Sequence, residues 1–262
     1  MAKKLSLMSK KILLLFLLFF LVDYLCAMRY LFKLLILTIA ISACGDKGCT
    51  DPLATNYNSD ATKDDGSCEH NTLNINLKIT HNGTALSEYD VFEKDGKSFR
   101  LETMRYYLSH LSLSSTDGTS EEVEVHLFDI DKESTHQVEL NNLKQDLYNS
   151  IHFNLGLDEA LNSSDPNSFS SNHPLSASNN TYWNMEPASY MFVMFEGKID
   201  SLGGANFDFP KTYHLAHQDL LRSISINHTI DFSESNSLTI SLHLEIGEMF
   251  NNINISEQVP HS

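Results

Sequence analysis

Residues 72–83 read TLNINLKITHNG, and this stretch decides the class of fold. Its apolar residues occupy every second position: Leu73, Ile75, Leu77 and Ile79. A period of two is typical of a β-strand that buries one face, and the His-Asn-Gly that follows is typical of a turn. The segment therefore predicts a half-buried strand.

The same alternation returns at residues 123–127, 151–155, 224–230 and 238–246. Residues 190–195 (YMFVMF) are apolar throughout, which indicates a central strand covered on both faces. Turn signals such as Asp117-Gly118 separate these runs. Seven or eight strands in about 180 residues predict an all-β domain, either an antiparallel β-sandwich or a barrel-like domain.

Composition and charge limit the classes of function. The 262 residues carry 18 Lys and Arg against 34 Asp and Glu. Residues 1–43 hold six of these bases and one acid, so the net charge changes from −16 for the whole chain to −21 for the remainder. So acidic a surface repels phosphate backbones, and we expect no nucleic-acid partner.

The N-terminal region predicts export. Residues 12–22 form an apolar run too short to span a membrane, and a second run after Lys33 ends at Cys44. Ile41-Ser-Ala-Cys44 resembles the lipobox of bacterial lipoproteins, in which the Cys is lipidated. We predict a signal peptide at 1–43, with Met28 as the true start, and a lipid anchor on the outer membrane or cell surface. A plain cleaved signal, with Cys44 free to form a disulfide, is the alternative.

If Cys44 is lipidated and Cys26 is removed with the signal peptide, Cys49 and Cys68 remain as an even pair, which predicts a disulfide in an exported chain. Residues 44–70 would then form a lipidated N-terminus with a small Cys-bounded module, similar to one found in secreted proteins of marine Bacteroidetes. The enclosed sequence is rich in the oxygen donors that calcium prefers. The candidate calcium ligands are Asp51, Asn58, Asp60, Asp64 and Asp65. A solvated spacer is the alternative.

The alternation of faces along each predicted strand also indicates which histidines lie at the surface and which lie in the core. His126, His152 and His243 share their faces with polar residues and are predicted to lie at the surface. His228 shares its face with isoleucines and is predicted to lie in the core. His110 cannot be placed on either face, because both faces of its segment mix polar and apolar residues.

His214 and His217 lie three residues apart in the segment YHLAH. On a continuous strand they point to opposite faces, so they ligate one metal only if the strand ends between them. The polar Gln218-Asp219 that follows is compatible with such an end.

Four segments in order carry a family resemblance. They are residues 104–113 (MRYYLSHLSL) with Asp117-Gly118, 148–158 (YNSIHFNLGLD) with Asn162, 182–185 (YWNM) with 190–197 (YMFVMFEG), and 213–216 (YHLA). Together they resemble the MbnP-like family of exported copper-binding proteins, which is related to the MopE/CorA proteins of methanotrophs. The resemblance covers residues 72–250, within a β-domain expected at 71–262. Met185, Ser189 and Ala216 stand where the family has Trp, Gly and Gly.

The resemblance implies a copper site in which a Trp, oxidised to kynurenine in the best-known members, lies with histidines. Trp183 would be that Trp and His214 the matching ligand. Met185 and His217 complete the candidate metal ligands, because thioether sulfur suits Cu(I) and imidazole suits copper. An exported dihaem peroxidase-like protein is the partner that the resemblance implies.

The sequence favours a binding protein over an enzyme. It contains no G-x-S-x-G elbow, no H-E-x-x-H and no phosphate-binding Gly loop. We expect copper acquisition or storage. The alternative is a surface sandwich without a metal that binds a protein or glycan through residues 162–181, the longest gap between predicted strands.

Overall fold

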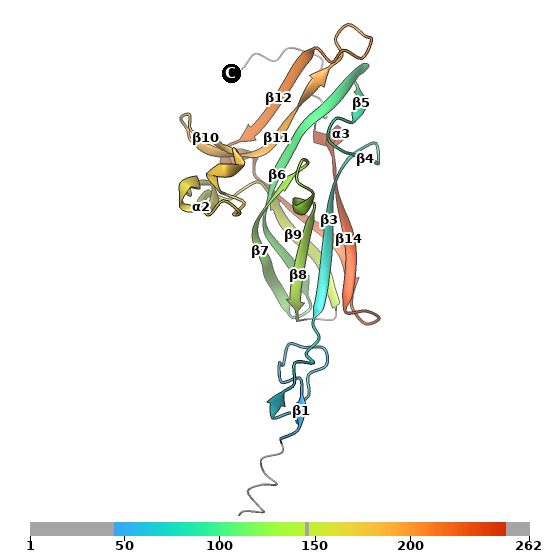
Figure 1. Ribbon diagram of the computed structural model, residues 1–262, viewed down its shortest axis with the longest axis vertical. Helices are drawn as coiled ribbons and strands as arrows, with labels where there is room; N and C mark the ends of the chain where they lie inside the picture. The colour runs from blue at the N-terminus through green and yellow to red at the C-terminus, as the bar shows by residue number, and fades with distance from the viewer. Residues whose placement is uncertain (1–44, 145–146, 250–262) are drawn as a thin grey trace, which may run out of the picture. The chain divides into compact units, whose positions relative to one another are not determined.

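The computed structural model describes residues 45–144 and 147–249 of the chain (Figure 1). The predicted signal peptide and Cys44 lie outside these residues. The chain divides into two compact units. A small unit contains residues 45–52 and 56–68, and a large unit contains residues 53–55 and the described residues from 69 onward.

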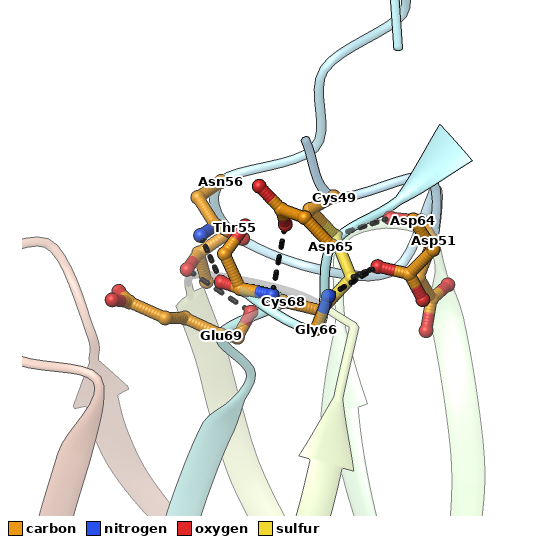
Figure 2. The surroundings of a disulfide bond; sticks show 10 residues. Cys49, Asp51, Thr55, Asn56, Asp64, Asp65, Gly66, Cys68 and Glu69 are labelled. Atoms are coloured by element: carbon orange, nitrogen blue, oxygen red, sulfur yellow. Dashed lines mark hydrogen bonds between the residues drawn. A yellow bond between two sulfur atoms is a disulfide. The ribbon is translucent and has the colours of Figure 1, made fainter. Parts of the chain in front are cut away.

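The small unit is built on a disulfide. Cys49 and Cys68 are bonded, with their Cα atoms 4.7 Å apart, which confirms the predicted bridge. The strands β1 (Lys47–Gly48) and β2 (Lys63–Asp64) pair in parallel within it. Asp64 and Asp65 each accept a backbone N–H two residues ahead, at 2.9 and 3.0 Å, so local turns shape the segment before Cys68 (Figure 2).

The large unit contains an eight-stranded sheet centred on the long strand β6. Strands β11 and β12 form a hairpin that extends this sheet beyond β6 (Figure 1). Its members are β5 (Val91–Lys94), β6 (Lys97–Ser115), β7 (Gly118–Asp129), β9 (Leu147–Leu155), β10 (Tyr182–Trp183), β11 (Ser189–Ile199), β12 (Phe209–Ala216) and β13 (Arg222–Asp231). Every pair in it is antiparallel.

A second sheet of four strands packs against it. Its members are β3 (Asn71–His81), β4 (Thr84–Leu86), β8 (Gln137–Leu143) and β14 (Ser237–Glu245). The opening stretch of the sequence forms β3, where Leu73, Ile75, Leu77 and Ile79 are all buried as predicted. The fold is thus the expected all-β sandwich, except that β14 joins β3 in parallel.

One main core fills the space between the two sheets. It unites the buried face of β3 with Phe99, Tyr106, Phe128 and Phe195 from the large sheet. A separate cluster around Tyr107, Tyr190 and Phe192 lies elsewhere in the unit and packs with Leu157 and Leu175. Strand β11 therefore contributes to both of these clusters, which agrees with its apolar character on both faces.

The helical segments are short. They are η1 (Glu133–Thr135), α2 (Glu159–Asn162), η2 (Pro166–Ser168), η3 (Ala177–Asn179), η4 (Gln218–Leu220) and α3 (Ile246–Met249). None of the helices within residues 45–144 and 147–249 has the length and apolar composition of a membrane-spanning helix. Residues 162–181 are held down by two buried tyrosines. The Tyr107 hydroxyl donates to the Pro174 carbonyl at 3.0 Å, and that of Tyr190 donates to the Leu175 carbonyl at 2.8 Å.

The structure corrects three of the histidine assignments. His243 is exposed as predicted, but His126 and His152 are half-buried. His152 Nε2 lies 2.9 Å from the hydroxyls of both Ser114 and Ser150. His228 is exposed rather than in the core, because the pairing of β13 with β9 shifts between Asn227 and Ile230. An irregularity of this kind changes the face of the residues within it.

Candidate metal site on strands β10, β11 and β12

The candidate site lies where three strands meet. Strand β10 pairs with the start of β11, placing Trp183 opposite Ser189. Strand β12 also pairs with β11, placing His214 opposite Met194. Non-local pairing thus brings Trp183 and His214 together.

The rings of Trp183 and His214 are in contact. Their centroids are 6.3 Å apart and the planes meet at 89°, an edge-to-face arrangement. Trp183 remains 38% exposed, so its indole is open to solvent on one side. The aromatic residue and the imidazole singled out in the sequence are therefore neighbours in space.

His214 also pairs with a carboxylate. Its Nε2 lies 2.6 Å from Oε1 of Glu196, a residue two positions beyond Met194 on β11. A carboxylate only accepts, so Nε2 carries the proton in this pair. In the neutral imidazole the lone pair is then on Nδ1. A carboxylate that fixes the tautomer in this way is typical of metal-binding histidines.

A β-bulge shapes the same part of β11. Met191 pairs with Ala216 and Val193 pairs with Leu215, so β11 has one extra residue, Phe192, between the two pairs. The bulge puts Met191 on the face of β11 that carries Met194. Met191, Met194 and Ala216 consequently form a small buried cluster of their own.

A pocket of about 280 Å³ adjoins these residues. It is lined by Trp183, Met185, Glu186, Pro187, Ser189, Ala216 and His217. Met185 is 62% exposed. Strand β12 ends at Ala216, so the strand does end between His214 and His217. His217 follows with φ 95° and ψ 142°, a left-handed conformation that favours glycine.

Four predicted residues thus lie in one region: Trp183 and His214 in contact, and Met185 and His217 on the adjoining pocket. Glu196, Met191 and Met194 were missed as site residues. The motif YMFVMFEG contains all three, but strict alternation places the two methionines on opposite faces. Only the bulge brings them together.

The predicted calcium ligands show a different arrangement. Asn58, Asp64 and Asp65 each use one side-chain oxygen to accept a backbone N–H two residues ahead. The Ser67 hydroxyl and N–H hold the pKa of Asp65 below its ordinary value. Within residues 45–144 and 147–249, no three His, Cys, Asp or Glu side chains converge in a way that could hold a metal ion.

A second pocket, of about 490 Å³, lies against residues 171–179. It is lined by His126, Leu127, Asp129, Lys132, Ser134, Thr135, Ser171, Asn172, His173, Pro174 and Asn179. The Asp129 carboxylate is buried, with Arg105 Nε at 3.0 Å and Lys132 Nζ at 3.5 Å. Burial lowers the pKa of His126, so its imidazole is neutral at neutral pH.

The sequence model of the MbnP family matches residues 70–262. The chain belongs to the MbnP family. The solved structure of MbnP from Methylosinus trichosporium is also similar, with 13% identity and a TM-score of 0.41. The similarity covers 61% of this chain and 71% of that one. No curated protein matches the chain. The MbnP match includes every strand from β3 to β14, and with them the site on β10, β11 and β12.

Proposed function

We propose that the MbnP domain binds copper at the site on β10, β11 and β12, for acquisition or storage of the metal. The observation that carries this proposal is the contact between Trp183 and His214, two residues far apart in the sequence. The family resemblance implies copper ligation at these same two positions, which supports the proposal. Bound copper would supply a redox-active centre with affinity for nitrogen and sulfur.

The donor chemistry fits copper. His214 offers Nδ1, while Glu196 holds Nε2–H and adds a negative charge beside the imidazole. Met185 and His217 line the adjoining pocket and supply a thioether and a second imidazole. Thioether sulfur and imidazole nitrogen are ligand types that suit copper.

We infer that the protein acts from a lipid anchor. The support is the sequence before Cys44, with its short apolar runs and lipobox. We also propose a binding role rather than catalysis and, from the family resemblance, a dihaem peroxidase-like partner that oxidises Trp183. The 38% exposure of Trp183 is compatible with access by such a partner. Loss of the lipid mass in Cys44→Ser tests the anchor, and the intact mass of peptides that contain Trp183 tests the oxidation.

Metal analysis of protein purified without chelators tests copper binding. His214→Ala and Trp183→Phe should each lower the bound copper well below that of the wild type. His243→Ala removes an exposed imidazole from β14 and should leave copper unchanged. If wild type and both site variants bind equal copper, or none, the proposed site is wrong.

A second candidate function rests on the second pocket, the one of about 490 Å³ beside residues 171–179. His126 Nε2 donates to the Thr135 carbonyl at 2.8 Å, which leaves Nδ1 as an acceptor. His173 Nδ1 accepts the Leu175 N–H at 3.1 Å, which leaves Nε2–H as a donor. Together with the hydroxyls on its walls, these groups suit a hydroxylated ligand such as a glycan.

Screening of soluble oligosaccharides tests this second function. Binding that is lost in His173→Ala and kept in His214→Ala would support a glycan site separate from the copper site. Binding that is unaffected by His173→Ala would exclude this pocket.

A further inference from the structure

We propose that the copper site takes Cu(I) through the sulfur atoms of Met191 and Met194 together with His214. This inference rests on the proposed function and makes it more specific, because it names the oxidation state and two further ligands. Neither methionine was among the candidate ligands found in the sequence.

The β-bulge in β11 places Met191 and Met194 on one face of the strand. Met194 lies directly opposite His214, and Met191 lies directly opposite Ala216, two residues further along β12. Residues directly opposite in an antiparallel pair lie on the same face, with Cβ atoms about 5 Å apart. The bulge at Phe192 therefore places both sulfur-bearing side chains on the face that carries His214.

The two methionines form a buried cluster that is separate from the main core. Met191 and Met194 are 8% and 7% exposed, and they pack with Ala216 apart from the main core. Ala216 also lines the pocket that contains Trp183 and Met185. Ala216 therefore belongs both to the methionine cluster and to the lining of the pocket.

The donor atoms of this cluster favour Cu(I) over Cu(II). Thioether sulfur is a soft, neutral ligand that selects Cu(I), whereas Cu(II) prefers nitrogen and oxygen donors in a tetragonal arrangement. The Glu196 carboxylate, which is bonded to His214, offsets the single positive charge of Cu(I). Arg105 lies opposite Met194 on β6, but its guanidinium is paired with Asp129.

A role in packing alone is the competing explanation, and leucine substitution separates the two. Leucine has nearly the volume of methionine and keeps an apolar cluster intact, but it has no sulfur. Met104→Leu is the matched control, because Met104 is fully buried in the main core on β6. A cooperative unfolding transition in urea establishes that each variant is folded. If the double variant does not fold, the single variant Met194→Leu is used for the test.

The experiment measures Cu(I) affinity of the full mature chain under anaerobic reducing conditions, by competition with a coloured Cu(I) chelator. Cu(II) affinity is measured in parallel, and X-ray absorption reports sulfur ligands. We expect Met191→Leu/Met194→Leu to weaken Cu(I) binding at least about tenfold, to lower the sulfur signal clearly below that of the wild type and to leave Cu(II) binding unchanged. Met104→Leu should match the wild type in all three measurements.

The outcomes distinguish the two proposals. If copper binding depends on His214 but not on the methionines, methionine ligation is wrong and the proposed function stands. If the double variant loses Cu(II) as much as Cu(I), the preference for Cu(I) is wrong. If the wild type binds no copper in either oxidation state, both proposals are overturned.

Discussion

At the scale of single residues, the site depends on how each imidazole is held. His214 is held by its hydrogen bond to the Glu196 carboxylate and by its edge-to-face contact with the Trp183 ring. His217 is held by the backbone instead, in a conformation that costs a non-glycine residue about 1–3 kcal/mol. Strain of this kind persists when the surrounding structure imposes it, and here it lies next to the proposed metal site.

The strain at His217 gives a prediction about stability. Glycine adopts this conformation without the clash of a Cβ atom, whereas alanine keeps the clash and loses the imidazole. We expect His217→Gly to have a free energy of unfolding about 1 kcal/mol higher than His217→Ala, after allowance for the greater freedom of glycine in the unfolded chain. Urea unfolding measures the difference. Equal stabilities would show that the backbone at this position relaxes.

His126 predicts a dependence of stability on pH. Burial lowers the pKa of His126 below its ordinary value of 6.5, so the unfolded chain takes up this proton at a higher pH than the folded chain does. As the pH falls below about 6.5, the free energy of unfolding should therefore decrease, by at most about 1.4 kcal/mol per pH unit from this group.

Urea unfolding between pH 5 and 8 checks the sign of this effect. His126→Gln should flatten the decrease on the acid side, and the exposed His243→Gln should not. A decrease that is identical in wild type and His126→Gln would mean that other groups cause it.

At the scale of elements, β11 organises the domain. It pairs with β6 and β12, and with β10 at its start, and it packs into three clusters of apolar residues. Its buried Tyr190 joins Tyr107 of β6 in holding residues 162–181 against the sheet. A segment that appears in the sequence as a long irregular gap is therefore anchored at both Pro174 and Leu175.

Removal of one anchor should loosen this segment. The Tyr107 hydroxyl lies 3.0 Å from the Pro174 carbonyl and 2.6 Å from the buried Thr181 hydroxyl. Tyr107→Phe leaves these groups without that partner, so we expect a loss of about 1–3 kcal/mol in stability and faster amide exchange in residues 171–181.

The neighbouring Tyr106→Phe is the control. Tyr106 is also buried, and burial alone raises the pKa of its hydroxyl, whereas the Tyr107 hydroxyl is bonded to Thr181. This change should therefore cost little. Comparable losses in both variants would show that the hydroxyls do not act as anchors.

At the scale of the whole molecule, the two units are stabilised by different means. The large unit has an apolar core between two sheets. The small unit has little apolar surface to bury, and among its described residues the strong constraint is the Cys49–Cys68 bond. Small units with weak cores usually depend on such a cross-link.

Reduction should therefore act on one unit selectively. Closing a loop of 19 residues stabilises by about 3 kcal/mol in the chain-entropy model. After reduction, or in Cys49→Ser/Cys68→Ser, we expect proteolytic cuts within residues 50–67. The thermal transition of the β-domain should not change, because its core contains no disulfide in the described residues. Mass spectrometry of the fragments and calorimetry test both points.

The sequence by itself determined the local features of this protein. Alternation predicted β3 and the all-β class, a continuous apolar run predicted the central β11, and the even cysteine pair predicted the Cys49–Cys68 bond. These follow from the sequence because a strand needs only its own residues to show a period of two, and a cysteine pair has one possible connection. The motifs also pointed to Trp183 and His214.

Only the tertiary structure decided which side chains meet. The pairing of β14 with β3 in parallel, the exposure of His228 and the common face of Met191, Met194 and His214 all depend on strand register. Register is set by hydrogen bonds between distant segments, and one extra residue in a bulge reverses the faces that follow. The contents of the proposed copper site were therefore fixed by long-range pairing that no local pattern records.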